Sequence, residues 1–284
     1  MKTASISIAS FFVFGFFILM SSVVFAAPNT DRVPAQNDKS GVDVVIPQHA
    51  VQVAEHVFSL GEAIDPTTGR RVEGYAIVHP KSGSKRPGTP GGGTTTSSCY
   101  AFLAKGAKWK SAEPWVVDPA NGEGLAEASV FGILDASIAK WEDAADGTLD
   151  SQVSINIVGS GATSTGFAPS GSMDGINGVR FGSLDAGTIG VTVIWGVFGG
   201  PIQGRELVEW DQVYNTFYSW NTDGNPSDMD FESIATHELG HSVGLADLYQ
   251  PECSEATMYG YGSEGDTKAR SLHTGDVAGI SVLY

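Results

Sequence analysis

Residues 99–284 are predicted to form one α+β domain, and three features of the sequence support this fold class. Runs with the apolar pattern of strands stand on both sides of a long segment with helical spacing. Two further helical segments follow the last of these strands. No internal repeat interrupts the order. A strand, a helix, several strands and two helices in succession are typical of an α+β domain.

The strands are predicted from short runs that are continuously apolar or that alternate between apolar and polar residues. Alternation is clearest in residues 151–159, through Val153, Ile155 and Ile157. The same alternation runs through residues 187–195. Strand-like runs also occupy residues 99–109, 114–119 and 206–220.

The helices are predicted from apolar spacing and from the residues at their ends. In residues 125–147, four apolar residues recur at helical spacing before a terminating glycine. They are Val130, Leu134, Ile138 and Trp141. Asp230 is a suitable N-cap for a second helix, and Gly244 lies just past its end. Residues 274–284 fit a short closing helix.

Residues 1–26 have the layout of a secretory signal peptide. Lys2 precedes a long apolar stretch, and the small residues Val24 and Ala26 place the cleavage site before Ala27. An uncleaved membrane anchor over residues 6–25 is the alternative, but the cleavage site and the polar segment after it favour removal. We therefore expect a secreted, extracellular protein with no stable membrane insertion.

Residues 27–98 differ in texture from the rest of the chain. Residues 57–80 contain two strand-like runs around an Asp-Pro-Thr-Thr-Gly turn, which predicts a β-hairpin within a small N-terminal segment, 27–80. Residues 81–98 are rich in Gly, Pro, Ser and Thr, which predicts a flexible linker that proteases can cut. The segment is either a propeptide or a retained appendage, and the sequence favours neither.

The composition limits the partners. The chain of 284 residues is 42% hydrophobic and 10% aromatic, as expected of a globular protein. Its 32 acidic and 16 basic residues give a net charge of −16, without a basic stripe. Nucleic acid is therefore excluded as a partner. We expect a monomer.

The stretch THELGHSVGLADLY, residues 236–249, carries the spacing of a zinc site. His237 and His241 lie one helical turn apart, so both imidazoles project from one face and can share a metal ion. Glu238 follows the first histidine, where its carboxylate reaches a metal-bound water and suits a general base. Alternatively, the histidines are partly buried structural residues and the glutamate lies on the surface.

Features beyond these three residues favour the metal site. Gly244 can take positive φ easily, so the chain can turn and return Asp247 towards the histidines. Met258 follows eleven residues later in ATMYGY. The stretch HELGHSVGLAD resembles the extended zinc signature of the metzincin peptidases, and TMYG resembles their Met-turn. Further similarity to prokaryotic matrixin-like members lies in residues 174–184, 208–220 and 275–284, and the whole resemblance covers residues 99–284.

This resemblance implies a metzincin-like zincin fold and a zinc endopeptidase. The fold would have a mixed twisted sheet of about five strands, a backing helix, an active-site helix and a C-terminal helix. His237 and His241 would bind one catalytic zinc ion, Glu238 would be the general acid and base, and Met258 would form a hydrophobic floor. Residues 187–195 are our candidate for the strand at the cleft rim that pairs with an extended substrate.

Asp247 stands where the family usually has a third histidine, as it also does in snapalysin-like metzincins. A carboxylate oxygen is a competent zinc ligand, although its negative charge makes the metal a weaker Lewis acid. The alternative is that His273 supplies the third ligand and Asp247 lies outside the first coordination shell.

The two cysteines, Cys99 and Cys253, are most simply one disulfide in an oxidising compartment. Alternatively, Cys99 could block the zinc, as a propeptide cysteine does in many matrixins, which would leave Cys253 unpaired. No cysteine lies between residues 27 and 98, so no mechanism of latency can be read from the sequence.

Two further possibilities stay open. Calcium could bind the oxygen-rich stretch NTDGNPSDMD, although helix capping and turns also explain its residues, which include Asp223, Asn225, Asp228 and Asp230. The protein could instead be a non-catalytic secreted binding module on a zincin scaffold, or a zinc hydrolase of another bond. The complete His-Glu-His set argues against the module, and the Met-turn argues against the other hydrolase.

Overall fold

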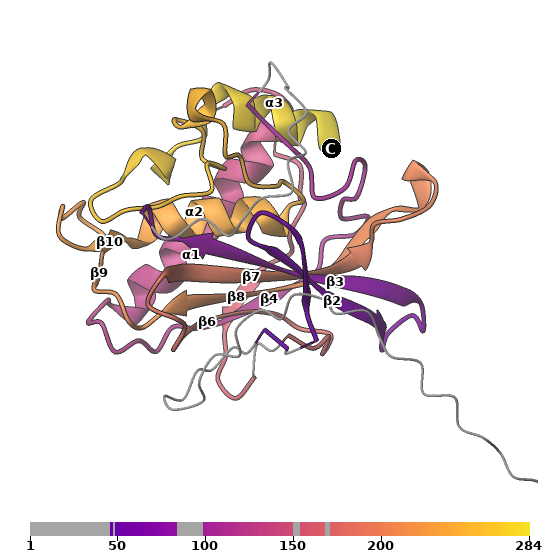
Figure 1. The fold of residues 1–284 in the computed structure, drawn as a ribbon, viewed down its shortest axis with the longest axis horizontal. Coiled ribbons are helices and arrows are strands. Elements are labelled where there is room, and N and C mark those ends of the chain that lie inside the picture. Colours follow the sequence, from indigo (N-terminus) through magenta and orange to yellow (C-terminus); the bar gives the residue numbers. More distant parts are fainter. Residues whose placement is uncertain (1–45, 48, 84–98, 150–153, 168–170) are drawn as a thin grey trace, which may run out of the picture. The chain divides into compact units, whose positions relative to one another are not determined.

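The strand-like runs assemble into one mixed sheet of eight strands, seen in Figure 1. The computed structural model describes residues 46–47, 49–83, 99–149, 154–167 and 171–284. Across the sheet the strand order is β1-β2-β3-β7-β8-β6-β4-β5. The strands are β1 (Val51–Ala54), β2 (Val57–Ile64), β3 (Arg71–Pro80), β4 (Trp115–Asp118), β5 (Gly161–Thr163), β6 (Asn177–Gly182), β7 (Thr188–Val197) and β8 (Glu206–Asn215). The short strands β9 (Trp220–Asn221) and β10 (Met229–Asp230) form a separate pair.

Five strands of the sheet come from residues 99–284, and three come from the N-terminal segment. Strands β6, β4 and β5 run parallel to β8, whereas β7 is antiparallel to both of its neighbours, β8 and β3. Strands β2 and β3 form an antiparallel hairpin in which Ile64 pairs with Arg71. The predicted α+β fold with a mixed sheet and three helices is confirmed, but three N-terminal strands lengthen the sheet.

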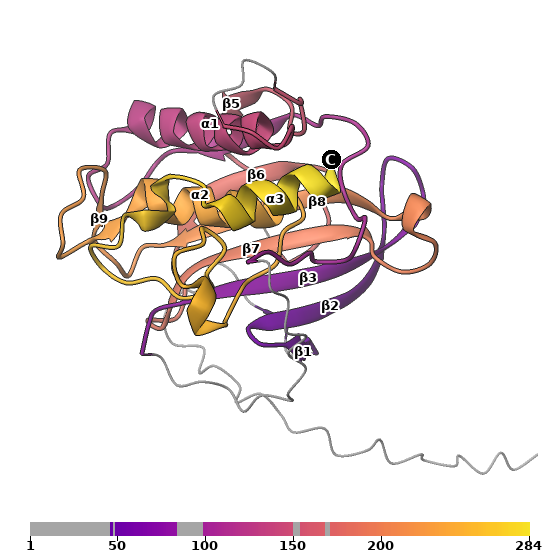
Figure 2. The same ribbon diagram turned by 90° about the horizontal axis from the view of Figure 1, so that it is seen from above.

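Three α-helices pack beside the sheet: α1 (Glu127–Ala144), α2 (Phe231–Ser242) and α3 (Thr274–Leu283). Short 3₁₀ turns lie at Ile202–Gly204, Pro251–Cys253 and Lys268–Arg270. Figure 2 shows α1 and α2 side by side, and the Trp141 indole joins them by donating to the Thr236 carbonyl at 2.9 Å. All four apolar residues that predicted α1 are buried, as their helical spacing requires. Within the described ranges, no helix is long and apolar enough to cross a membrane.

Two predicted strands are absent from the parts that the structure describes. Residues 154–159 form no ladder, because the Glu142 carboxylate accepts hydrogen bonds from the backbone N–H groups of Ile157 and Val158 in place of a neighbouring strand. Residues 99–109 form only one isolated bridge, between Phe102 and Leu245, and then turn through Gly106 at φ 81°. Apolar residues therefore marked partly buried chain in both places, but not strand pairing.

Cys99 and Cys253 form a disulfide that joins the start of the domain to the loop after α2, with a sequence separation of 154. The bond restricts a long loop of the unfolded chain, which stabilises the folded state on chain-entropy grounds. We expect the double substitution Cys99→Ser/Cys253→Ser to lower the free energy of unfolding by up to ~5 kcal/mol. Urea denaturation followed by tryptophan fluorescence measures the difference. A loss below ~1 kcal/mol would contradict the chain-entropy argument.

Candidate metal centre

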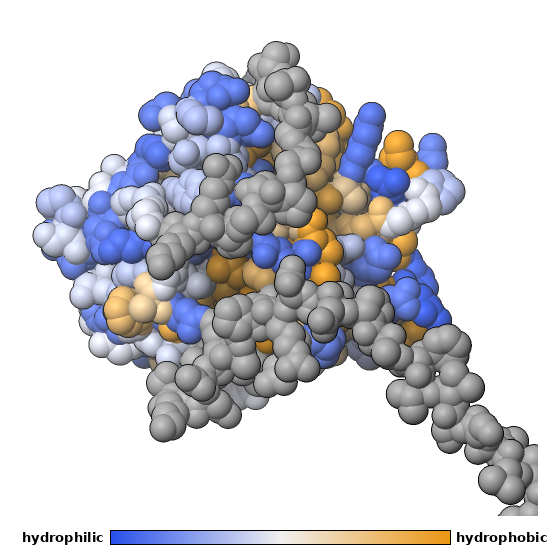
Figure 3. All heavy atoms as spheres, viewed as in Figure 1, coloured by the Kyte–Doolittle hydropathy of each residue, from blue (hydrophilic) through white to orange (hydrophobic). Residues whose placement is uncertain are grey.

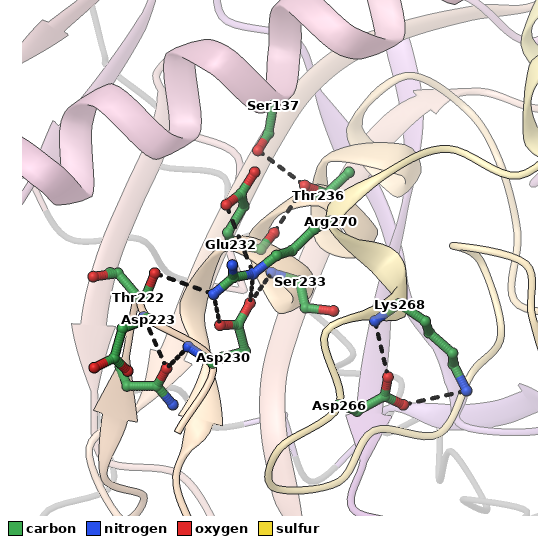
Figure 4. Close-up of polar contacts among 12 residues, drawn as sticks. Ser137, Thr222, Asp223, Asp230, Glu232, Ser233, Thr236, Asp266, Lys268 and Arg270 are labelled. Atoms are coloured by element: carbon green, nitrogen blue, oxygen red, sulfur yellow. Dashed lines mark hydrogen bonds and ion pairs between the residues drawn. The ribbon is translucent and has the colours of Figure 1, made fainter. Parts of the chain in front are cut away.

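Helix α2, which carries the two histidines, is fixed at its first turn. The Asp230 side chain accepts a hydrogen bond from the backbone N–H of Ser233, so it caps the helix as predicted. Figure 4 shows the Arg270 guanidinium reaching the same carboxylate, with its Nε 2.9 Å from Asp230 Oδ1. Arg270 also donates to the Thr222 carbonyl at 3.1 Å. These contacts set the position of the helix, and with it the direction in which His237 and His241 project.

His237 and His241 lie on one face of α2, and both are buried. The Nδ1 atom of His237 lies 2.7 Å from the Thr257 carbonyl oxygen, and Nδ1 of His241 lies 3.0 Å from the Leu245 carbonyl oxygen. Because a carbonyl can only accept, Nδ1 carries the proton in both rings. Each Nε2 is therefore the ring atom left to bind a metal ion, and neither has a hydrogen-bond partner among the described residues.

Gly244 turns the chain back after α2 and brings Asp247 to the histidines. Its φ is 106°, and a Cβ there would lie 2.9 Å from the Leu283 side chain and 3.0 Å from the Ala107 carbonyl oxygen. Oδ1 of Asp247 lies 3.2 Å from His237 Nε2 and 3.4 Å from His241 Nε2. The other oxygen, Oδ2, accepts a hydrogen bond from the Tyr249 hydroxyl at 2.9 Å.

These three side chains fit a zinc ion. Two imidazole nitrogens and one carboxylate oxygen form a recognised zinc donor set, and all three atoms are buried without a hydrogen-bond partner within the described structure. Bond lengths of about 2.0–2.1 Å in a tetrahedral site require neighbouring ligand atoms about 3.3 Å apart. The distances from Asp247 Oδ1 to the two Nε2 atoms, 3.2 Å and 3.4 Å, are close to this value. Burial lowers the pKa of His241, but the Asp247 carboxylate beside it raises that pKa to about 9. The site therefore attracts positive charge.

Met258 packs against α2 at Gly240, the residue before His241. The side chain is buried, and a Cβ on Gly240 would lie 2.2 Å from its sulfur, so the glycine lets the methionine pack directly against α2. The Asp276 carboxylate of α3 accepts from the backbone N–H of Thr257 at 2.8 Å and from that of Met258 at 3.3 Å. Helix α3 thus holds the Met258 turn against the metal site.

Glu238 is buried beside the candidate metal ligands, and both of its carboxylate oxygens are hydrogen-bonded. Oε1 lies 3.0 Å from His79 Nδ1, and Oε2 accepts from the Thr192 hydroxyl of β7. Burial alone would raise the pKa of Glu238, but the hydrogen bond from His79 and the nearby histidines bring it below its usual value. The carboxylate is therefore ionised, as a general base must be.

His79 is a site residue that the sequence did not predict. It belongs to β3, yet its ring centroid lies 4.0 Å from that of His237, and it forms a second potential metal-binding group with His237 and Glu238. No spacing rule connects it to Glu238, since 159 positions separate them. The one available indication was a histidine at the end of an apolar strand, which has to find a buried partner.

His273, the alternative third ligand, lies elsewhere. Its side chain is exposed and caps α3, where Nδ1 accepts a hydrogen bond from the Gly275 backbone N–H at 3.3 Å. It belongs to none of the potential metal-binding groups among the described residues. Of the two candidates, the structure thus brings Asp247 to the histidines.

The oxygen-rich stretch considered for calcium has protein partners for its side chains. Asn221 Oδ1 accepts from three successive backbone N–H groups, at positions 223–225. Asn225 donates to Asp228, and Asp230 is held by the helix cap and by Arg270. Figure 3 shows that the surface over β9 and β10 is mostly hydrophilic. These residues form no potential metal-binding group within the described structure. Calcium in this stretch stays a prediction.

A separate acidic group is formed by Asp174 and by two residues of β8, Glu209 and Asp211. Glu209 accepts hydrogen bonds from the backbone N–H groups of Asp174 and Gly175. Burial, opposed by these bonds and reinforced by the charge of Asp174, raises the pKa of Glu209 to about 7. Burial also raises the pKa of Asp211, whose Oδ2 has no hydrogen-bond partner among the described residues.

The raised pKa of Glu209 predicts that stability falls as the pH rises. The folded protein holds this proton more tightly than the unfolded chain, whose pKa is near the ordinary 4.5. Its contribution is therefore complete below about pH 4.5 and is lost as the pH passes through about 7, a change of up to ~3 kcal/mol. We expect Glu209→Gln to reduce the loss of stability between about pH 5 and about pH 8, measured by urea denaturation of both proteins. Equal losses would contradict the assignment.

Comparison with known proteins agrees with this geometry. Residues 108–284, more than half of the chain, match the matrixin family of peptidases. Human matrilysin is 40% identical over 63 residues and rat matrilysin is 41% identical over 63 residues. Each match covers 22% of this chain and 22% of the relative, so the chain spans about a fifth of the length of these curated relatives. On the family match, the chain belongs to the matrixins.

Proposed function

We propose that this protein is a secreted zinc endopeptidase that uses His237, His241 and Asp247 as metal ligands and Glu238 as general base. One observation carries the proposal: three buried, unpartnered ligand atoms meet beside a buried, ionised glutamate. Membership of the matrixin family supports metalloendopeptidase activity. The signal-peptide layout of residues 1–26 and the disulfide support secretion.

The reaction assigns a distinct task to each side chain. When bound, zinc supplies a Lewis acid that polarises the attacking water and the scissile carbonyl. Glu238 takes a proton from the water as it attacks and delivers a proton to the leaving amine. Thr192 and His79 hold the carboxylate in the structure described here, and Thr192 can continue to orient it when substrate is present.

Asp247 distinguishes this site from one with three histidines. Its carboxylate adds a negative charge at the metal, so the attacking water ionises less readily and more of the activation falls to Glu238. The hydrogen bond from Tyr249 draws some of that charge away from the coordinating side and fixes the carboxylate. Asp247 and Tyr249 are therefore proposed to act as a pair.

The substrate is proposed to be an extended peptide. A small hollow beside His237, lined in part by residues of the segment 256–262, is the proposed entrance for one substrate side chain. Strand β7 passes next to Glu238 through Thr192, so a peptide paired with β7 would present its backbone to the general base.

The test is metal content together with proteolysis, on purified residues 27–284. We expect mass spectrometry to find one zinc ion per chain, and any hydrolysis of casein or of a quenched fluorescent peptide to stop when a chelator removes the zinc. Hydrolysis should return when zinc is restored. A protein that binds no zinc, or whose proteolysis resists the chelator, would refute the proposal.

A further inference from the structure

We propose that residues 71–82 form an internal inhibitor that lies in the substrate position of the active site, so that the chain as folded here is latent. The inference rests on the proposed function. It assigns the N-terminal segment a role in latency, whose mechanism cannot be read from the sequence, and it identifies His79 as the side chain that blocks the general base.

The first observation is that β3 occupies the edge of β7 where a substrate would pair. The two strands are antiparallel from Glu73, opposite Gly196, to Pro80, opposite Thr188. The other edge of β7 is paired with β8 along its length. Both rows of main-chain groups on β7 are therefore in use, and no extended peptide can add to this strand while β3 remains in place. Figure 1 shows β3 next to β7 in the sheet.

The second observation is that the chain after β3 is held from both sides, as a bound peptide would be. The Lys81 N–H donates to the Gly187 carbonyl at 2.9 Å, on the β7 side. On the opposite side, the Ser82 N–H donates to the Gly262 carbonyl at 2.7 Å, and the Gly262 N–H donates to the Pro80 carbonyl at 3.3 Å. The Lys81 ammonium also pairs with Glu264. The segment thus bridges β7 and the wall of the substrate hollow.

The third observation is that His79 fills the space in front of Glu238. Its side chain is 2% exposed, it donates through Nδ1 to Glu238 Oε1 at 3.0 Å, and it helps to line the hollow beside His237. With Thr192 on Oε2, the carboxylate has a protein partner on each oxygen, and the His79 ring occupies the side of Oε1 from which an attacking water would approach. A Cβ on Gly262 would lie 3.2 Å from His79 Nε2, so this glycine leaves room for the ring.

The fourth observation is that a hydrophobic cluster anchors the inhibitory segment. Leu60, Val72 and Ala76 of the N-terminal strands are buried together with Val191 and Trp195 of β7. Gly74 lies directly over the Trp195 ring, which a Cβ would approach to 2.5 Å. Burial of such apolar side chains favours docking of the segment. Cutting the linker alone would therefore leave the segment docked, and activation requires that it dissociate or be degraded.

The experiment compares four forms of residues 27–284: wild type, His79→Ala, the undocking variant Val72→Asp/Ala76→Asp, and the matched control His49→Ala. His49 is an exposed histidine of the N-terminal segment 27–80, and it lies outside the inhibitory residues 71–82. Three quantities are measured on each form: zinc content, hydrolysis of a quenched fluorescent peptide, and hydrogen exchange at the amides of β7. Zinc content and exchange report on the site and on docking independently of activity.

We expect wild type and His49→Ala to be equally slow and to protect the β7 amides that face β3. Removing a charge-assisted hydrogen bond should make His79→Ala about tenfold faster or more. The undocking variant should be the fastest, with rapid exchange at β7 and unchanged zinc. If the undocking variant exposes β7 but hydrolyses peptide no faster than wild type, and wild type is active, the inhibitor proposal is wrong and the proposed function stands.

A different result would overturn the proposed function itself. An undocking variant that holds zinc and exposes β7 but cleaves neither peptide nor casein has no endopeptidase activity to inhibit, and both proposals then fail. If the two aspartates prevent folding, as judged by circular dichroism, a site-specific protease sequence inserted between Gly91 and Gly92 replaces them. Cutting there and diluting should release activity and β7 exchange together, and adding a peptide of residues 71–83 should restore the inhibition, whereas its His79→Ala form should inhibit less.

Discussion

Glu238→Gln will reduce peptide hydrolysis by about 10²- to 10⁴-fold, the range expected when a general acid–base group is lost, while zinc remains bound. The amide has nearly the same shape as the carboxylate, but it cannot take a proton from the attacking water. Since no atom of Glu238 is among the three ligand atoms that meet at the proposed metal position, replacing Glu238 should leave the metal content unchanged. Steady-state kinetics and mass spectrometry on the same preparations measure both quantities. If wild type is latent, both proteins are compared in the undocking background.

The matched control for this prediction is Glu232→Gln on the same helix. Glu232 lies in the first turn of α2, where it pairs with Lys140 at 2.6 Å and does not contact the metal ligands. Its replacement should leave hydrolysis close to wild type. Near-normal activity in Glu238→Gln would remove Glu238 from the mechanism, and zinc loss in that variant would mean that the carboxylate helps to bind the metal.

Asp247→Ala will weaken zinc binding by more than about 100-fold, the upper range for losing only an outer partner of a metal ligand, and proteolysis will be lost with the metal. The substitution removes one of three converging ligand atoms and the only carboxylate among them. The remaining pair of imidazoles would hold zinc without a charged ligand in a buried site. Competition with a chromophoric chelator gives the affinity of each variant.

Two further variants serve as references for the zinc affinity of Asp247→Ala. Tyr249→Phe removes only the hydroxyl that donates to Asp247 Oδ2, so its zinc affinity should fall by about 10- to 100-fold. His273→Ala should leave the affinity unchanged, because that side chain caps α3 at the surface. Zinc retained by Asp247→Ala and lost by His273→Ala would instead make His273 the third ligand.

Local rules predicted the residues around α2 because their geometry is local. A separation of four residues places His237 and His241 on one helical face, and Asp230 and Gly244 mark the helix ends by capping and by positive φ. The return of Asp247 needs only the turn at Gly244. Each of these relations spans a few residues, so the sequence contains the physical constraint directly.

The role of β3 could not be predicted, because a strand pattern does not specify its partner. Alternation in residues 71–80 indicates which side chains are buried, and the same alternation would suit a free hairpin or a third sheet. Only tertiary structure pairs this strand with β7 and brings His79 to Glu238. The failure at residues 154–159 has a related cause, since a distant carboxylate, Glu142, took the place of a strand neighbour.

The Cys99–Cys253 disulfide has a consequence for autolysis. It encloses β4 to β8, α1 and α2, whereas Arg270 and Asp276, which hold α2 and the Met258 turn, lie beyond Cys253. A single cut anywhere between the two cysteines would leave the pieces covalently joined, and they would migrate as one species until reduced. The inhibitory segment lies outside this closed loop. Proteolysis can therefore discard the segment permanently, whereas nicks within the loop leave the enzyme in one piece.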